Sequence, residues 1–172
     1  MANTRFSSAL HVMVVLSEGA HDTVVSSDVF AERLSTHPVV IRRLISDLKA
    51  AGLVDVIRGA GGGIRLARGK APLSLGDIAR AVDFEPAFDV HDLPGVPKDA
   101  FDPHVHATLL AAQRDASKAL LEYLDGTPLE SVVNGSTLRG DLAALVEKGL
   151  SDSEIRQAYR VAGGHMVPKA DR

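Results

Sequence analysis

The sequence predicts a mainly α-helical protein with a small β-hairpin, a long helix and a helical C-terminal extension. Apolar residues recur at intervals of three and four over most of the chain, which is typical of amphipathic helices. Two short β-branched segments flank a glycine-rich stretch, which indicates a hairpin. Aromatic residues make up only 4% of the 172 residues, and tryptophan is absent from the sequence. The core is therefore expected to be aliphatic.

Three short helices are expected before the hairpin. The apolar spacing predicts the first helix over 4–17, and Ser27 is expected to cap a second helix over 28–34. Pro38, whose fixed φ suits the first position of a helix, opens a third helix that Gly52 ends. The expected inward positions of this third helix are Val40, Ile41, Leu44, Ile45 and Leu48.

The hairpin is expected from two segments, 53–58 and 64–68, with alternating or β-branched character. The sequence between them, Gly59-Ala60-Gly61-Gly62-Gly63, favours a tip whose backbone adopts positive φ. The alternative is a nucleotide-phosphate loop, which would need a glycine where Ile64 stands and a helix after it. The hairpin tip is the better interpretation.

Beyond the hairpin, the sequence predicts a linker and a long helix. Ser74 and Asp77 match a capping box, which starts a helix through Val82. Residues 84–102 are rich in proline and acidic residues and are expected to form a connecting loop. A helix then runs over 103–124, about 33 Å in length.

The long helix carries a heptad seam. Its apolar residues follow steps of four and three, the spacing at which two helices pack side by side. We expect this seam to form a homodimer, with an intramolecular helical hairpin as the alternative. The seam consists of Val105, Leu109, Ala112, Ala116, Ala119 and Tyr123.

The C-terminal extension is expected to be helical. Asn134-Gly135 marks a turn, and apolar residues over 138–146 predict a helix. Ser151 and Glu154 match a second capping box. The helix that it opens is expected to stop at Gly163-Gly164, with the last eight residues frayed. The predicted parts of the chain are a domain over 1–83, a loop over 84–102, a dimerisation helix region over 103–133 and an extension over 134–172.

The composition excludes several kinds of site. The chain has no cysteine, so disulfides, thiolate nucleophiles and Cys-ligated metal centres are excluded. Neither an 18-residue apolar run nor a secretory leader is visible, so a cytoplasmic protein without a membrane span is expected. Residues 1–70 carry a net charge of +3 and residues 71–172 a net charge of −6. This asymmetry favours a polyanionic partner for the first third of the chain.

Three short helices followed by a hairpin, with basic residues on the third helix and the hairpin, predict a winged helix-turn-helix DNA-binding domain over 1–83. The third helix is expected to enter the major groove by its N-terminal end. Arg58 and Arg65 flank the glycine tip, where a narrow minor groove attracts guanidinium groups and glycine N–H groups approach phosphates. Which arginine reads a base is left open. The candidate DNA contacts are Arg5, Ser27, Thr36, His37, Pro38, Val39, Arg42, Arg43, Arg58, Gly61, Gly62 and Arg65.

Five segments in this order carry a resemblance to a known family: Thr4–His11, His37–Leu44, Ala51–Val54, Arg58–Arg68 and Pro72–Ile78. They resemble the Rrf-type family of bacterial transcription regulators, which includes iron–sulfur-cluster, nitric-oxide and cysteine-metabolism repressors. The resemblance covers about residues 4–133. It implies a dimeric regulator, usually a repressor, whose long helix makes the dimer. Members that sense iron or nitric oxide carry a cysteine cluster before that helix, so this sequence resembles a cysteine-poor branch that responds to another signal.

The histidines offer two candidate ligand sites. By resemblance, His11 matches the place of a histidine ligand in some cluster-binding relatives. His91, His104 and His106 form a concentration with Asp89, Asp92 and Asp102, and histidine suits several transition metals. However, helical residues two apart point about 200° away from each other, so a solvated acidic loop is favoured while a metal site stays open. No iron–sulfur cluster is expected, and a small-molecule effector is expected between His11 and His91.

The sequence does not predict an enzyme, because it shows no metalloprotease signature, nucleophile elbow or phosphate loop. The predicted function is a sequence-specific DNA-binding regulator that acts as a homodimer on a double-stranded operator. The alternative is a winged-helix protein-interaction module that does not read DNA. Salt distinguishes the two, since DNA affinity falls steeply as salt rises.

Overall fold

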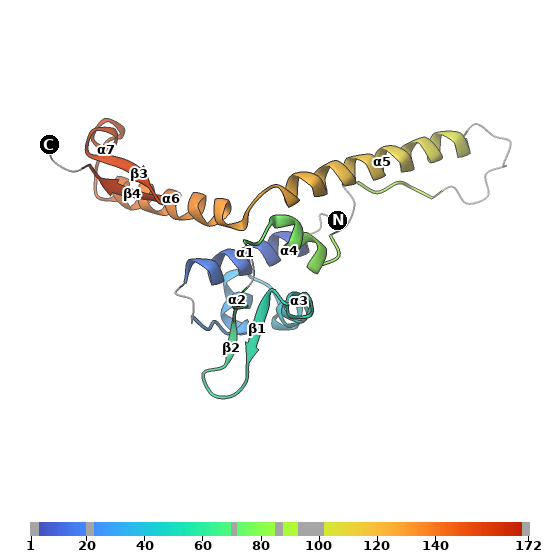
Figure 1. Cartoon of the computed structure of the whole chain (residues 1–172), viewed down its shortest axis with the longest axis horizontal. Coiled ribbons are helices and arrows are strands. Elements are labelled where there is room, and N and C mark those ends of the chain that lie inside the picture. Colours follow the sequence, from blue (N-terminus) through green and yellow to red (C-terminus); the bar gives the residue numbers. More distant parts are fainter. Residues whose placement is uncertain (1–3, 20–22, 70–71, 85–87, 93–101, 170–172) are drawn as a thin grey trace.

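The structure is a computed structural model that describes residues 4–19, 23–69, 72–84, 88–92 and 102–169. Helices and strands form two parts, a compact N-terminal domain and a long upper layer that projects from it on both sides (Figure 1). The described elements, in chain order, are α1 (Thr4–Glu18), α2 (Ser27–Arg33), α3 (Pro38–Ala50), β1 (Val54–Ile57), β2 (Gly63–Leu66), α4 (Leu75–Ala81), α5 (Asp102–Asp125), α6 (Leu129–Glu147), α7 (Asp152–Ala158), β3 (Tyr159–Ala162) and β4 (His165–Pro168).

The N-terminal domain confirms the predicted helices and hairpin. Its core is mainly aliphatic, with Phe30 buried and Phe6 and Phe84 partly buried against it. The largest fully buried side chains include Met13 of α1, Ile41 and Leu48 of α3 and Ile78 of α4. Burial of each such side chain contributes about 1.5–3 kcal/mol. The apolar face of each helix therefore meets the others around one core, as the spacing of three and four requires.

The hairpin is an antiparallel pair, β1 and β2, with Val56 opposite Ile64. Val25 extends it, because its N–H donates to the Ile64 carbonyl (2.9 Å) and its carbonyl accepts from the Ile64 N–H (2.8 Å). Gly63 is required at this point, since a Cβ there would lie 2.5 Å from the Val25 carbonyl oxygen. These hydrogen bonds hold the β1–β2 hairpin, which is the wing of the predicted winged helix-turn-helix domain, against the segment that precedes α2.

Two details of the N-terminal domain differ from the expectation. Ser26, not Ser27, caps α2, and its hydroxyl accepts from the Val29 N–H. Val40, expected to point inward, is 53% exposed, because the buried stripe of α3 consists of Ile41, Leu44, Ile45 and Leu48. The expected end of α3 is confirmed, with Gly52 at a φ of +68°.

The long helix is confirmed as α5, and its C-terminal end packs against the N-terminal domain. Of its described residues, Leu124 is the buried one. Two backbone hydrogen bonds join the α5–α6 connection to the segment before α4: the Leu75 N–H donates to the Thr127 carbonyl (2.9 Å), and the Leu129 N–H to the Leu73 carbonyl (2.8 Å). The N-terminal half of α5 projects beyond the domain (Figure 1).

The C-terminal extension differs from the helical expectation. Asn134-Gly135 lies inside α6 rather than in a turn, and the last helix ends at Ala158 rather than at Gly163. Strands β3 and β4 follow as an antiparallel hairpin, so residues 165–168 are paired and not frayed. The physical reason is that Gly163 and Gly164 both adopt positive φ (+57° and +78°) and form the hairpin turn instead of a helix end. Of the described helices, none is both long and apolar enough to span a bilayer.

Candidate nucleic-acid interface

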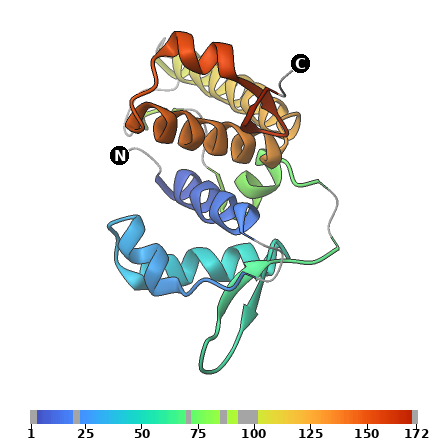
Figure 2. The same cartoon turned by 90° about the vertical axis from the view of Figure 1, so that its left-hand side faces the viewer.

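Helix α3, the helix expected to enter the major groove and called the reading helix below, lies on the same side of the molecule as the wing. Figure 2 shows both below α1, away from α5 and α6. The N-terminal turn of α3 exposes two apolar side chains, Val39 (46% exposed) and Val40 (53% exposed). An exposed apolar pair at the start of a reading helix suits contact with thymine methyl groups.

His37 is exposed, and it also caps the N-terminus of α3. It is the N-cap of α3, and its Nδ1 accepts a hydrogen bond from the Val39 N–H at 3.2 Å. The neutral ring therefore carries its proton on Nε2, which is left as a donor. Pro38 follows as the first helical residue, and Thr36 is half-buried with its N–H donated to the Ala31 carbonyl (2.9 Å). His37 thus presents a side-chain donor at the helix start.

The arginines of the reading helix differ in their partners. Arg42 lies 3.4 Å from Asp28 of α2, and both side chains are more than 60% exposed, so this pair is weak and opens at little cost. Arg43 is exposed and has no ion-pair partner among the described residues. Arg5 forms an ion pair with Asp47, which joins α1 to α3. Arg43 is thus the arginine of α3 that is ready for an anion.

The two arginines of the wing also differ in their ion-pair partners. Arg65 pairs with Asp55, its partner across the hairpin, at 3.4 Å, and its side chain is 25% exposed. Arg58 follows β1 at the start of the tip, is exposed, and has no ion-pair partner within the described ranges. Arg58 is therefore the wing side chain that suits a narrow minor groove.

One backbone N–H of the glycine tip is already used in a hydrogen bond within the tip. The Gly62 N–H donates to the Gly59 carbonyl at 2.9 Å, so this N–H is not available to a phosphate. Gly61 has a φ of +77°, is exposed, and has no other heavy atom within 4 Å of a Cβ built on it. Of the two glycines expected to approach DNA, Gly61 has the open position.

A groove runs between the reading helix and the wing. It is a hollow of about 320 Å³ lined by Ser27, Arg42, Ile57 and Gly63. Ser46 and Lys49 also line it and were not among the expected contacts. The spacing of 42, 46 and 49 is the signal that marks them, because steps of four and three place residues on one helix face.

The predicted seam of α5 lies largely open to solvent. Val105 is 41% exposed and Tyr123 is 69% exposed, while Leu109 and Ala116 are half-buried and Ala112 and Ala119 are exposed. The buried Leu124 occupies a different face of the helix, about 100° around from Tyr123. The seam is therefore not used to hold α5 against its own domain, and its role in dimerisation stays a prediction.

The two expected ligand histidines have different surroundings. The ring of His91 meets the ring of His106 on α5, with centroids 6.0 Å apart, and the buried Nδ1 of His106 has no hydrogen-bond partner among the described residues. His11 is exposed on α1. A ligand held between His11 and His91 stays a prediction, which alanine at either position would rule out if induction in cells were unchanged.

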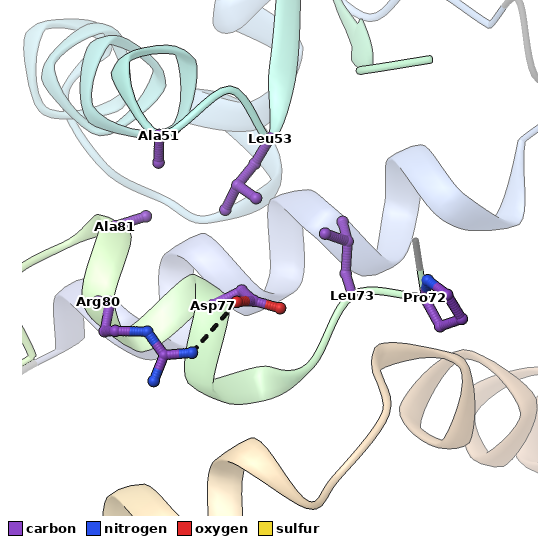
Figure 3. A pocket seen from close by; sticks show the side chains of 7 residues that line it. All are labelled: Ala51, Leu53, Pro72, Leu73, Asp77, Arg80 and Ala81. Atoms are coloured by element: carbon purple, nitrogen blue, oxygen red, sulfur yellow. Dashed lines mark hydrogen bonds and ion pairs between the residues drawn. The ribbon is translucent and has the colours of Figure 1, made fainter. Parts of the chain in front are cut away.

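A junction at α4 connects the reading domain to α5. Arg80 donates to Asp125 of α5 at 2.6 Å and to Asp77 at 3.1 Å. The backbone N–H of Ser74, with smaller contributions from its hydroxyl and from Arg80, lowers the pKa of Asp77. Figure 3 shows Arg80 turned towards Asp77. Both side chains line a hollow of about 420 Å³, which Leu53, just before β1, also lines.

These features define a class of protein. A capped reading helix, a basic wing and a groove between them form the working face of a winged helix-turn-helix transcription regulator. The family model Rrf2, described as an iron-dependent transcriptional regulator, matches residues 2–135. The chain belongs to this family, and the family consists of regulators rather than enzymes.

Named relatives agree with this assignment. The HTH-type transcriptional regulator YwnA of Bacillus subtilis is 32% identical over 135 residues, which are 78% of this chain and 98% of that protein. The HTH-type transcriptional regulator IscR of Vibrio vulnificus is 27% identical over 133 residues, 74% of this chain and 77% of that protein. Among solved structures, CymR, the global cysteine regulator of B. subtilis, superposes with a TM-score of 0.52 and 27% identity, covering 77% of this chain and 95% of CymR.

The family description names iron, and the donors among the described residues do not form a group that fits it. Cysteine is absent from the whole sequence. Across the described ranges, no group of three His, Cys, Asp or Glu side chains is placed to hold a metal ion. The rings of His91 and His106 meet edge to face, with no third donor grouped with them among the described residues. The described residues therefore do not build an iron or iron–sulfur site.

Proposed function

We propose that the protein is a homodimeric repressor that reads a double-stranded operator and responds to a signal other than an iron–sulfur cluster. The observation that carries the proposal is the pairing pattern of the arginines on one face. Arg5 and Arg65 are held by carboxylates, whereas Arg43 and Arg58 are exposed on the reading helix and the wing with no ion-pair partner among the described residues. Two free cations on the two elements that enter DNA grooves suit an operator.

The homodimer is supported by the open seam of α5. A 24-residue helix spans about 36 Å, and its described residues bury only Leu124. Exposed apolar side chains at heptad spacing favour a second copy of the same helix. A two-fold axis through this helix would present two reading helices to one DNA duplex.

The test is operator selection with the full chain. Genomic fragments, including the promoter of its own gene, are mixed with the protein at several salt concentrations, and the bound fragments are sequenced. We expect a near-palindromic site whose half-sites are spaced by about 10 bp or a multiple of it. Binding that depends on salt but is indifferent to sequence would refute the regulator, and an absence of DNA binding at low salt would favour the protein-interaction module.

A further inference from the structure

The C-terminal extension carries a pocket beyond the family match at residues 2–135. It is a hollow of about 420 Å³ between α6, α7 and the β3–β4 hairpin. Leu138 and Leu142 of α6 line it, with Met166 of β4 and with Ile155 of α7, which is 4% exposed. Concave sites of this size with a mainly apolar lining are typical of small-molecule pockets.

The mouth of this pocket is basic. Arg156 and Arg160 both line it, and the Lys169 amine lies close by, donating to the Arg156 carbonyl at 2.6 Å. Asp152 also lines the pocket and lies 3.5 Å from Arg156, with both side chains more than 80% exposed. An ion pair so exposed contributes little to stability. Arg160 is exposed and has no ion-pair partner among the described residues.

We propose that this pocket binds an aliphatic monocarboxylate. The hydrocarbon tail lies against the leucines of α6 and Ile155, and the carboxylate lies at Arg160 and Arg156. Guanidinium groups suit carboxylates because their planar donors match the two oxygens. Each methylene that the pocket covers raises the affinity about fourfold. Apolar walls and a basic mouth together select this class over neutral apolar molecules and over small hydrophilic anions.

The position of the pocket connects it to the reading domain through one helix. The half of α6 that lines the pocket continues into Val132 and Val133, which pack against the N-terminal core. Thr137 donates to Glu18 of α1 at 3.1 Å, and Asp141 accepts from the Met166 N–H at 2.9 Å, which fastens the hairpin to α6. A ligand held between the hairpin and α6 therefore acts on a helix packed against α1. This role as the signal site rests on the proposed function.

Isothermal titration calorimetry of the full chain without DNA tests the binding. Octanoate, hexanoate and octanamide are titrated into the wild type, Arg160→Gln and the matched control Arg114→Gln, whose residue is exposed on α5. We expect saturable binding of octanoate, about 15-fold weaker binding of hexanoate from two fewer methylenes, and at least tenfold weaker binding of octanamide. Arg160→Gln should weaken octanoate at least tenfold, and Arg114→Gln should not change it.

Three results would overturn the pocket: no saturable octanoate binding, equal affinity for octanoate and octanamide, or equal effects of Arg160→Gln and Arg114→Gln. If octanoate affinity falls as protein concentration rises, a second copy of the chain, rather than a carboxylate, occupies the pocket. The selected operator then provides an independent readout. Octanoate should change operator affinity in the wild type and not in Arg160→Gln; binding without this change would refute the signal role, whereas failure of operator selection alone would refute only the proposed function.

Discussion

Replacing Gly76 with alanine should destabilise the protein, although alanine is the better helix former. Gly76 is the second residue of α4 and lies against Asp125 at the end of α5. A Cβ built on Gly76 would lie 1.7 Å from the Asp125 Oδ1, 2.8 Å from its Cγ and 3.0 Å from its backbone nitrogen. The carboxylate must therefore move, and it gives up its 2.6 Å bond with Arg80.

The net effect follows from three contributions. Overpacking costs about 1–3 kcal/mol, and loss of an ion pair whose side chains are 54% and 45% exposed costs at most about 1 kcal/mol. The Gly-to-Ala change recovers about 0.5–1 kcal/mol. Taken at their middle values, these contributions lower the free energy of unfolding of Gly76→Ala by about 2 kcal/mol, or its Tm by about 4–8 °C for a chain of this size.

Gly140 provides the matched control. It lies in the interior of α6, where no other heavy atom comes within 4 Å of a Cβ built on it, so Gly140→Ala should raise stability by about 0.5–1 kcal/mol. Both variants are measured by urea unfolding at one protein concentration, because oligomerisation makes stability concentration-dependent.

The reasoning also predicts non-additivity between Gly76 and Asp125. Because Asp125→Ala removes the carboxylate that clashes, the double variant should lose less stability than the sum of the two single variants. A Gly76→Ala protein as stable as the wild type, or additive losses in the cycle, would refute the close contact.

Four further predictions concern DNA binding, assembly, pH and redox. Arg58→Ala should weaken operator binding by about 1–3 kcal/mol and Lys49→Ala by less in fluorescence anisotropy, because Lys49 lies in the last turn of α3, away from the N-terminal turn expected to face the bases, and contacts at most phosphate; equal losses would contradict the assignment of Arg58 to the DNA minor groove. Leu109→Asp should yield a monomer in sedimentation and lose operator binding, because it places a charge in the seam; a monomeric wild type would exclude the seam. Since the pKa of Asp77 lies below its ordinary value of 3.8, its stabilisation is present above that pH and lost as pH falls through the lowered pKa; Asp77→Asn should flatten this acid limb in urea unfolding. Thiol oxidants should leave operator affinity unchanged, because the chain has no cysteine.

Most of the reading domain could be predicted from local sequence. The apolar spacing of α1 and α3, the Ser74 capping box and the glycine tip are each encoded by neighbouring residues, because helix periodicity, caps and positive φ depend on local backbone geometry. The same holds for the length of α5 and for the basic character of the third helix. The fold class could therefore be predicted from the sequence, while the individual DNA contacts stay predictions.

Only the tertiary structure decided which candidate side chains are engaged and how the chain ends. Arg65 and Arg58 look alike in sequence, yet Asp55 lies opposite Arg65 across the hairpin while Arg58 stands at the tip. Gly163-Gly164 suits a helix end as well as a hairpin turn, and in the fold the strand after it is held against α6 by Asp141. Neighbouring residues thus determined which segments form helices and strands. The ion pairs, and the choice between a helix end and a hairpin turn at Gly163-Gly164, depended on partners distant in the sequence, which local patterns do not contain.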